Sequence, residues 1–191
     1  MNAGASEALE RSLRGNLDLA TLLDGWAAVA LPDAWLVAGC LAQTVWNARF
    51  GQPPTHGIGD IDLVYFDPDD LSQASEAGHE ARLRAAFPSV SARLDVKNQA
   101  RVHCWYEAKF GKPLAPYASA PAAIATYPTT ATCLGVRPAP AGLEFCAPFG
   151  VADLMAGIVR PNKVLVTEAV YATKTARWQA AWPGLHVMAW A

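Results

Sequence analysis

The sequence has little charge, few cysteines and no long uninterrupted apolar run. Charged residues make up 17% of the 191 residues and the net charge is −2, so we expect no strong binding to bulk nucleic acid. The cysteines include no Cys-x-x-Cys pair, which argues against zinc ligation and disulfides. We expect four buried free thiols in a reducing cytosol. They are Cys40, Cys104, Cys133 and Cys146.

No segment has the features of a membrane span or a signal peptide. The most apolar segment, residues 26–42, is interrupted by Pro32-Asp33, and the N-terminus has neither a basic start nor an apolar run. A hydrophobic content of 52% is typical of a globular chain, and we expect it to be cytoplasmic. The length suits one domain, 1–191, with N-terminal helices at about 5–30 and a helical annex at about 150–185.

The charge is unevenly divided between the two halves of the chain. Residues 1–92 hold 5 basic and 12 acidic residues, a net charge of −7, whereas residues 93–191 hold 10 and 5, a net charge of +5. An acidic half that faces a basic half suits a metal–phosphate ligand held between them. Simple attraction between the halves of one fold explains the pattern equally well.

The stretch Gly59–Phe66 carries the first functional signal. Its β-branched and aromatic residues predict a buried strand. Side chains on a strand alternate between two faces, so Asp60 and Asp62 share one face. Two adjacent carboxylates repel each other, and a divalent cation such as Mg²⁺ removes that cost because it prefers oxygen ligands. The alternative is a strand start where both carboxylates are exposed to water.

The segment before this strand predicts an anion-binding turn. Residues 35–40 read as a short strand that ends in Gly39 and Cys40, and residues 41–50 read as a helix that ends at Gly51. The first N–H groups of a helix have no partner within the helix, and the helix dipole favours negative charge there. Gly39 lets a phosphate approach the backbone closely. Together with the Asp pair, this turn suits a nucleoside triphosphate with its Mg²⁺.

Here the sequence resembles the polymerase-β-like nucleotidyltransferase superfamily, and within it a bacterial branch. The shared pattern is a small residue pair after a strand, a helix, Asp-x-Asp on the next strand, and a third acidic residue between apolar neighbours. The resemblance covers roughly residues 35–182. The matching segments are Ala38-Gly39-Cys40, Val45-Trp46-Asn47, Gly59-Asp60-Ile61-Asp62-Leu63-Val64-Tyr65, Asn98-Gln99-Ala100-Arg101-Val102-His103, Ala147-Pro148-Phe149-Gly150, Asp153-Leu154 and Arg160-Pro161-Asn162.

The resemblance implies an α/β (α+β) nucleotidyltransferase fold, in which helices back a mixed, mostly antiparallel sheet of about five strands. It also implies transfer of a nucleoside monophosphate from a nucleoside triphosphate to a hydroxyl acceptor, with release of pyrophosphate. Asp60 and Asp62 are expected to hold two Mg²⁺ (or Mn²⁺) ions, and the backbone N–H groups of Gly39 and Cys40 the triphosphate. The acceptor stays open between a small molecule, a protein and a tRNA end.

The sequence departs from the superfamily at Cys40, where Gly or Ser is usual. A thiol bonds a phosphate poorly, whereas a Ser hydroxyl does so well. This departure keeps open a catalytically lapsed module that binds nucleotide and regulates another process. A tRNA-modifying toxin of the same superfamily is a separate alternative, with which the basic second half of the chain is compatible.

The third carboxylate is expected on a third strand, predicted over residues 89–96. Within it, apolar and polar residues alternate, and Asp95 stands between apolar neighbours. A surface ion pair between Asp95 and Arg93 is the alternative. A helix is predicted over residues 99–110, and Arg101 in its first turn is expected to face a phosphate.

The C-terminal half predicts two strands, residues 129–136 and 143–146, followed by helices at 150–159 and 164–178. Lys174 and Arg177 lie three apart and therefore on one face of the last helix, where they suit a phosphate clamp. A solvated helix face is an equal alternative. We expect Trp178, Trp182 and Trp190 to cover the core.

Overall fold

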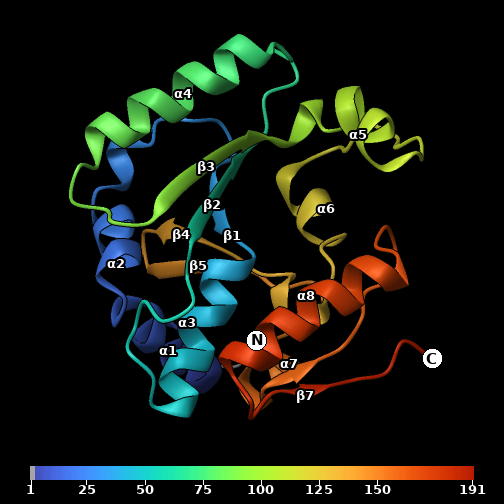
Figure 1. Ribbon diagram of the computed structural model, residues 1–191. Helices are drawn as coiled ribbons and strands as arrows, with labels where there is room; N and C mark the ends of the chain where they lie inside the picture. Colours follow the sequence, from blue (N-terminus) through green and yellow to red (C-terminus); the bar gives the residue numbers. More distant parts are fainter. Residues whose placement is uncertain (1–2) are drawn as a thin grey trace.

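A computed structural model describes residues 3–191. Within them, five strands form a mixed sheet in the order β3-β2-β1-β4-β5 (Figure 1). Only the β2–β3 pair of this sheet is parallel. The predicted α/β class and the mostly antiparallel sheet are therefore confirmed. The strands are β1 (Trp35–Val37), β2 (Asp60–Tyr65), β3 (Arg93–Asn98), β4 (Gly135–Ala139) and β5 (Gly142–Cys146).

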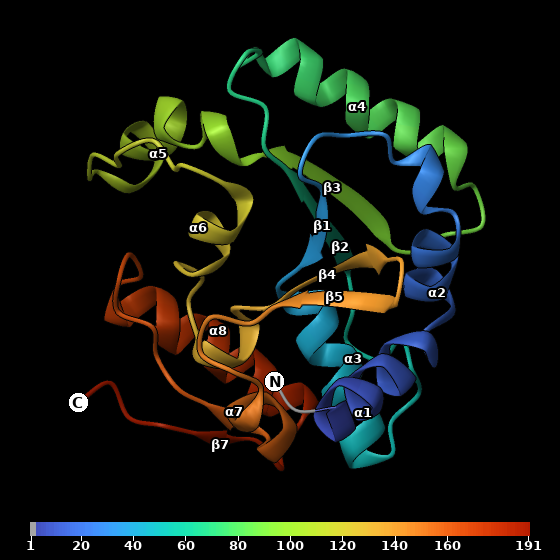
Figure 2. The same cartoon turned by 180° about the vertical axis from the view of Figure 1, so that it is seen from behind.

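Helices cover both faces and one edge of this sheet (Figures 1 and 2). The α-helices are α1 (Ala3–Arg14), α2 (Leu17–Asp24), α3 (Gly39–Phe50), α4 (Gln73–Ala86), α5 (His103–Phe110), α6 (Ala120–Ile124), α7 (Ala152–Ala156) and α8 (Glu168–Ala181). Short 3₁₀ helices lie at η1 (Trp26–Ala28), η2 (Gln99–Arg101) and η3 (Thr130–Thr132). A separate parallel pair, β6 (Ile158–Val159) and β7 (His186–Val187), lies near the C-terminus.

The main core fills one face of the sheet. The strands contribute side chains of a single pleat face, among them Leu36, Ile61 and Leu63, each fully buried. Helices α1, α2 and α3 lie over this face and add buried leucines and Trp46. As the alternation of the sequence predicted, Ile61 and Leu63 point into the core while Asp60 and Asp62 point to the other side.

The opposite face carries a smaller cluster and leaves room for a site. Trp35, Val37 and Val64 from β1 and β2 pack there against Ala120 and Ile124 of α6. This cluster covers the middle of the face only. The acidic end of β2 and the polar side chains of β3 lie beside it.

Helix α4 closes the open edge of β3 with its side chains. Glu76 and Glu80 accept hydrogen bonds from backbone N–H groups of the strand, at 2.8 Å from Asn98 and 3.4 Å from Val96. Arg84 donates to the carbonyl of Leu94 at 3.0 Å. An unpaired strand edge is a template for unwanted pairing with other chains, so this cover protects the sheet.

The C-terminal helix α8 is tied to the sheet domain through tryptophans. Trp178 and Trp182 are 3% and 2% exposed and pack edge-on against Trp46 of α3. The indole of Trp182 donates to Asn47 at 2.7 Å, and the amide of Asn47 donates to the carbonyl of His56 at 2.9 Å. As expected, these tryptophans cover the core, and they hold the C-terminal end of α8 against α3.

The third strand begins later than the sequence predicted. The prediction over residues 89–96 is wrong at its start, because β3 runs over Arg93–Asn98. The carboxylate of Asp18 on α2 accepts hydrogen bonds from the backbone N–H groups of Ser91 and Ala92. These groups are thus paired with a helix, and the alternating pattern alone did not reveal it.

Other boundaries move for reasons of capping. The strand predicted from residue 129 starts only at Gly135, because Thr129 caps η3 by accepting from the N–H of Thr132. The last helix begins at Glu168 because Thr167 caps it there. The helix predicted over 150–159 ends at Ala156, since Gly157 takes a left-handed φ of +71° before β6. The helix predicted over 99–110 is divided into η2 and α5.

All four cysteines are free, but they are not all buried. Cys40 and Cys133 are buried, Cys146 is half-buried and Cys104 is exposed. The prediction for Cys104 was wrong because α5 buries none of its residues and so leaves this thiol on its outer side. Among residues 3–191, no helix combines the length and the apolar character that a bilayer crossing requires.

Candidate active site

Three aspartates of β2 and β3 meet on the less covered face of the sheet. Asp62 and Asp95 lie directly opposite each other in the parallel pair, and Asp60 lies two residues before Asp62, opposite Arg93. Side chains at these positions share one face. The structure thus brings together the three carboxylates that the sequence singled out, although they come from strands separated by α4.

Asp62 is the central and the most crowded carboxylate. Its burial raises its pKa to about 7, and the negative charges of Asp60 and Asp95 add to the rise. The positive charges of Lys174 and Arg93 oppose it. Within residues 3–191, no cation lies within 4.0 Å of Asp62, whereas Asp60 and Asp95 each have such a partner. A cation that bound at Asp62 would therefore relieve the repulsion among the three carboxylates.

Cations of β3 hold the other two carboxylates. Arg93 pairs with Asp60 at 3.1 Å, and Lys97 pairs with Asp95 at 2.7 Å. Asp95 is thus bound by Lys97 and not, as the alternative interpretation had it, by Arg93. In this arrangement, no three His, Cys, Asp or Glu side chains of the described chain are gathered closely enough to enclose an ion.

The N-terminus of α3 lies beside these carboxylates. Its strand neighbour Val37 is the register partner of Asp62, and α3 begins two residues later, at Gly39. The helix was predicted to begin at residue 41. No side chain caps this end, and Ala38 at the cap position has φ +62° and ψ −129°. L residues rarely adopt that conformation, and such strain often marks a functional turn.

Cys40 faces the protein interior. Its thiol is 1% exposed and donates to the carbonyl of Val37 at 3.2 Å. Burial, and then the charge of nearby Asp62, raise its pKa well above its ordinary value. The side chain therefore lies in the core, and only the backbone N–H of Cys40 is placed at the uncapped helix end.

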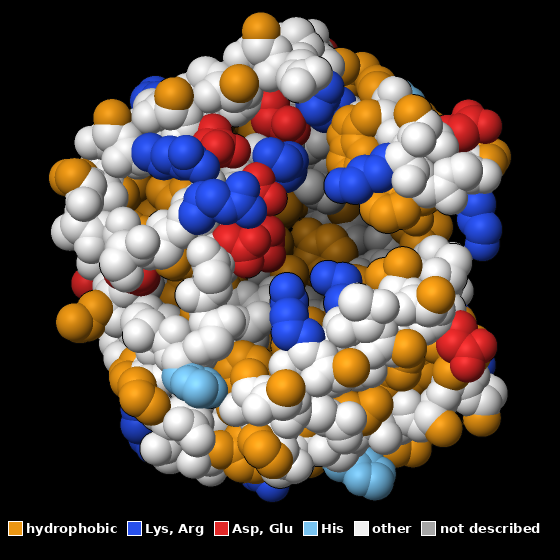
Figure 3. Space-filling view, in the orientation of Figure 1, with side chains coloured by type: hydrophobic (Ala, Val, Ile, Leu, Met, Phe, Trp, Pro, Cys, Tyr) orange, Lys and Arg blue, Asp and Glu red, His pale blue; other side chains and the backbone are white. Residues whose placement is uncertain are grey.

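Helix α8 supplies positive charge from the opposite side of the site. Lys174 is near enough to Asp62 and Asp60 for their charges to raise its pKa, but burial and the charge of Arg177 outweigh them and lower it. In Figure 3 acidic side chains lie at the rim of a central hollow, and basic ones lie over α8 on the other rim. A shallow depression of about 350 Å³ runs along α8, lined by Lys174 with Ala169, Val170 and Thr173.

Arg101 is engaged elsewhere. Its guanidinium pairs with the buried carboxylate of Glu76 at 3.1 Å and donates to the carbonyl of Leu71 at 3.1 Å. Only 11% of its side chain is exposed. The structure therefore ties Arg101 to α4 and to the loop before it, and does not turn it toward the three aspartates.

Two residues near the site were given no functional role from the sequence, where Arg93 entered only as an alternative surface partner of Asp95. Arg93 is one of the cations that act on Asp62, and its place on the polar face of β3 was a signal that pointed to it. Tyr127 packs against the cluster of Val37 and Val64. Burial, and then the charge of Asp62, raise the pKa of Tyr127 well above its ordinary value. No local pattern marked Tyr127, because its position depends on the loop after α6.

The parts of this site complement one another chemically. Carboxylate oxygens are the donors that divalent cations such as Mg²⁺ prefer, and an uncapped helix N-terminus favours an anion. Lys174 of α8 lies close enough to interact with the charges of Asp62 and Asp60. The arrangement suits a polyphosphate and its divalent cation held between the carboxylates and basic side chains.

Comparison with known proteins gives one family and one solved structure. A family model described as nucleotidyltransferase matches residues 24–187. The chain is also similar to a solved structure titled as an NMR structure that reveals a CCA-adding enzyme head domain. The TM-score is 0.76, with 28% identity over 94% of each chain. A comparison with curated proteins found no significant match.

Proposed function

This chain belongs to the nucleotidyltransferase family, and from that premise we propose that it transfers a nucleoside monophosphate from a nucleoside triphosphate to an acceptor hydroxyl. The bond that forms joins the acceptor oxygen to the α-phosphorus, and the bond that breaks releases pyrophosphate. The acceptor belongs to one of three classes, namely a small molecule, a protein side chain or a tRNA end. Free thiols and an otherwise ordinary composition suit a cytoplasmic enzyme.

One observation carries this proposal. Asp62 lies opposite Asp95 and beside Asp60 on one sheet face, with its pKa raised to about 7 and with no ion-pair partner of its own in the described chain. Asp62 is half-buried, and a structural aspartate in such a place is normally paired or solvated, because a carboxylate withdrawn from water without a counter-ion is costly. A bound cation would remove the electrostatic cost of this unpaired carboxylate, so the arrangement favours a cation site.

The donor atoms are those that divalent metal ions prefer. The three carboxylates would have to move closer together to share one ion, since the described residues hold no group of three that is already gathered around one. Asp60, Asp62 and Asp95 would hold Mg²⁺ or Mn²⁺, since all three offer carboxylate oxygens from one face. When bound, such ions polarise the phosphoryl oxygens and lower the pKa of a coordinated hydroxyl. Asp60 and Asp62 lie nearest the uncapped end of α3 and so suit the triphosphate side. Asp95, on the neighbouring strand, suits the acceptor side.

The chain's own donors orient the triphosphate. The backbone N–H groups of Gly39 and Cys40 stand at the uncapped N-terminus of α3, next to Asp62 through Val37. Lys174 on α8 would contact phosphate oxygens from across the hollow, with Arg177 beside it. These groups would fix the triphosphate beside the carboxylates, and positioning of this kind supplies much of the catalysis in phosphoryl transfer.

The test combines binding with turnover. Calorimetric titration with ATP and the other three triphosphates in Mg²⁺ measures binding, and a pyrophosphate-release assay with small molecules, protein extracts and tRNA as acceptors measures transfer. We expect Asp62→Asn to abolish release. Asp69→Asn, which changes an exposed aspartate in the turn before α4, is the matched control and should leave both signals unchanged.

The outcomes separate the candidate functions. Binding without release for any acceptor would identify a lapsed nucleotide-binding module instead of an enzyme. Release only with tRNA, together with growth arrest on expression, would identify a tRNA-modifying toxin. Absence of triphosphate binding in Mg²⁺ would contradict the proposed function as a whole.

A further inference from the structure

Two basic side chains of β3, Arg93 and Lys97, each form an ion pair with one of the three carboxylates. Arg93 and Lys97 stand two residues on either side of Asp95, so the three side chains share one face of the strand. Arg93 holds Asp60 at 3.1 Å, and Lys97 holds Asp95 at 2.7 Å. Each carboxylate next to Asp62 therefore already has an internal counter-ion.

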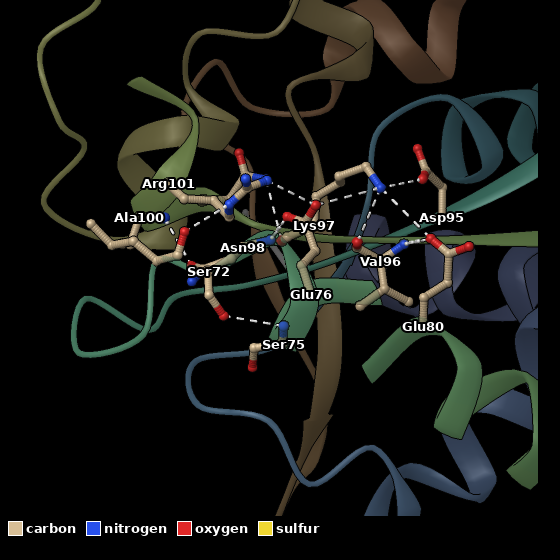
Figure 4. Close-up of polar contacts among 12 residues, drawn as sticks. Ser72, Ser75, Glu76, Glu80, Asp95, Val96, Lys97, Asn98, Ala100 and Arg101 are labelled. Atoms are coloured by element: carbon tan, nitrogen blue, oxygen red, sulfur yellow. Dashed lines mark hydrogen bonds and ion pairs between the residues drawn. The ribbon is translucent and has the colours of Figure 1, made fainter. Parts of the chain in front are cut away.

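Lys97 differs from Arg93 because it has a second set of acceptors within reach. Its ammonium nitrogen lies 3.6 Å from Glu80 and 3.9 Å from Glu76, both on α4. Figure 4 shows the ammonium with dashed lines to Asp95 and to both glutamates of α4. A small change in side-chain torsions moves the ammonium from Asp95 onto Glu80, since the lysine side chain is long and flexible.

The second set of acceptors is fixed in place independently of Lys97. Glu80 accepts from the backbone N–H of Val96 at 3.4 Å, and Glu76 accepts from that of Asn98 at 2.8 Å. Because these bonds cover the edge of the sheet, the two carboxylates keep their positions whichever partner Lys97 has. Lys97 thus stands between a carboxylate of the candidate metal site and a fixed acidic pair outside it.

We propose that Lys97 is a positioning residue that orients and neutralises Asp95 while no metal is bound, and that its ammonium moves to Glu80 and Glu76 when a divalent cation takes Asp95. This inference rests on the proposed function, because it assumes that Asp95 is a metal ligand. Lys97 competes with the metal for one carboxylate, so it weakens metal affinity. In exchange it keeps the acidic face from repelling itself when no metal is present.

The competition predicts an affinity change of known sign. Removal of the ammonium in Lys97→Met takes away a competitor and a repulsive charge, so Mn²⁺ should bind more tightly, by about 2- to 5-fold for a partly exposed ion pair. Lys97→Gln should show the same direction, and Lys97→Arg should bind as the wild type does. Lys112→Met, which removes an exposed lysine beyond the end of α5, should leave the affinity unchanged.

A double-mutant cycle tests the second set of acceptors. Glu80→Gln should weaken Mn²⁺ binding, because Lys97 then has a poorer alternative partner and stays on Asp95. In the background of Lys97→Met the same change should have little further effect. If Glu80 acts only as a distant negative charge, the two effects will add instead.

The measurement is the free Mn²⁺ signal in electron paramagnetic resonance, titrated with the full chain and with no nucleotide or turnover required. Circular dichroism checks that each variant is folded. Tighter binding by Lys97→Met, with a non-additive cycle, supports the proposal, and wild-type or weaker binding overturns it. If wild type and Asp62→Asn bind Mn²⁺ equally, the metal assignment itself fails. If Asp62→Asn loses binding while Lys97→Met matches the wild type, only the role of Lys97 fails.

Discussion

The backbone at Ala38 holds a conformation that alanine disfavours, at the turn where β1 ends and α3 begins. Its φ of +62° and ψ of −129° cost about 1–3 kcal/mol. The carbonyl of Leu134 accepts from its N–H at 3.0 Å, which keeps the turn in place. The strain falls on Ala38 and not on Gly39, whose φ is not positive. Gly39 is therefore free of strain and is open to a simple steric test.

A side chain at Gly39 should block a triphosphate without disturbing the fold. A Cβ there meets only the amide nitrogen of Gln43, at 3.3 Å, and that side chain is long enough to yield. We expect Gly39→Val to stay folded and to lose at least about tenfold in ATP affinity, equal to about 1.4 kcal/mol. Calorimetric titration with ATP and Mg²⁺ measures this loss.

The control at the same turn is Ala38→Gly, which removes strain and adds no side chain. It should gain about 1 kcal/mol of stability and keep its affinity for ATP. Cys40→Ser should leave ATP affinity unchanged, because the Cys40 side chain is turned into the core. A folded Gly39→Val protein that binds ATP as the wild type does would show that the phosphates do not lie at this turn.

The raised pKa of Asp62 predicts how the metal-free protein responds to pH. In the folded chain the pKa is about 7, above its value in the unfolded chain, so the folded state holds the proton more tightly. The contribution of Asp62 to the free energy of unfolding is therefore fully present below pH about 4, and it is lost as the pH rises through about 7. The loss amounts to at most about 4 kcal/mol.

Chemical denaturation in the presence of a chelator, at several pH values, measures this dependence. Asp62→Asn should show a flatter stability curve across the same range and should be the more stable protein at pH 8. A wild-type curve parallel to that of Asp62→Asn would mean that Asp62 is already ionised at low pH, in contradiction to the crowding described above.

At the scale of elements, side chains of α4 satisfy the free backbone groups along the edge of β3. Its glutamates serve two neighbours at once, because they accept from strand N–H groups and also pair with cations of the strand and of η2. Glu76 is the most enclosed of these groups, with 9% of its side chain exposed. This element therefore links the stability of the edge strand to the placement of Asp95.

Glu76→Ala should destabilise the protein strongly. The change removes the only carboxylate partner that the half-buried Arg101 has within residues 3–191, although Arg101 keeps its hydrogen bond to the carbonyl of Leu71. It also leaves the N–H of Asn98 without an acceptor, and together these losses cost about 3 kcal/mol or more. Thermal and urea denaturation measure the loss. The exposed Glu107→Ala on α5 should stay within about 0.5 kcal/mol of the wild type. A loss of less than about 1 kcal/mol for Glu76→Ala would show that Arg101 finds another partner.

At the scale of the whole molecule, the site lies between the sheet and α8. The carboxylates belong to β2 and β3, and the facing Lys174 belongs to helix α8, 112 residues after Asp62 and 79 after Asp95. The sheet domain and α8 are joined by Trp182, whose indole is 2.7 Å from Asn47. The negative first half and the positive second half of the sequence meet across the hollow.

Trp182→Phe should loosen this junction. The phenyl ring fills part of the same volume but leaves the buried side-chain oxygen of Asn47 without its donor, for a loss of about 1–3 kcal/mol. Because α8 carries Lys174, ATP affinity should fall as well. Denaturation and calorimetric titration measure the two effects, with Trp190→Phe near the C-terminus as the control. Unchanged ATP affinity would mean that α8 does not contact the nucleotide.

Metal and nucleotide together should stabilise the whole chain by mass action. A ligand at 100 times its dissociation constant adds about 2.7 kcal/mol, which for this size raises the melting temperature by about 5–10 °C. We expect this rise with Mn²⁺ and ATP, followed by scanning calorimetry. The double variant Asp60→Asn, Asp62→Asn should melt at a higher temperature than metal-free wild type and show no rise. A wild-type melting curve that ignores millimolar Mn²⁺ and ATP would exclude the site.

The sequence by itself determined the contents and the faces of the central elements. Alternation over β2 placed Asp60 and Asp62 on one side and Ile61 and Leu63 on the other, and the predicted mixed sheet is confirmed. These features follow from local periodicity, which a strand fixes without reference to the rest of the chain. Motifs also indicated the nucleotidyltransferase family, which the family match confirms.

Only the tertiary structure decided which charges face each other. The parallel register set Asp95 opposite Asp62, and the packing of α4 and α8 assigned Arg101 to Glu76 and Lys174 to the aspartates. The carboxylate of Asp18 on α2 accepts from the N–H groups of Ser91 and Ala92, so the predicted strand begins only at Arg93. Long flexible side chains reach several elements, so their partners depend on distances that packing sets and that residue spacing along one strand or helix does not contain.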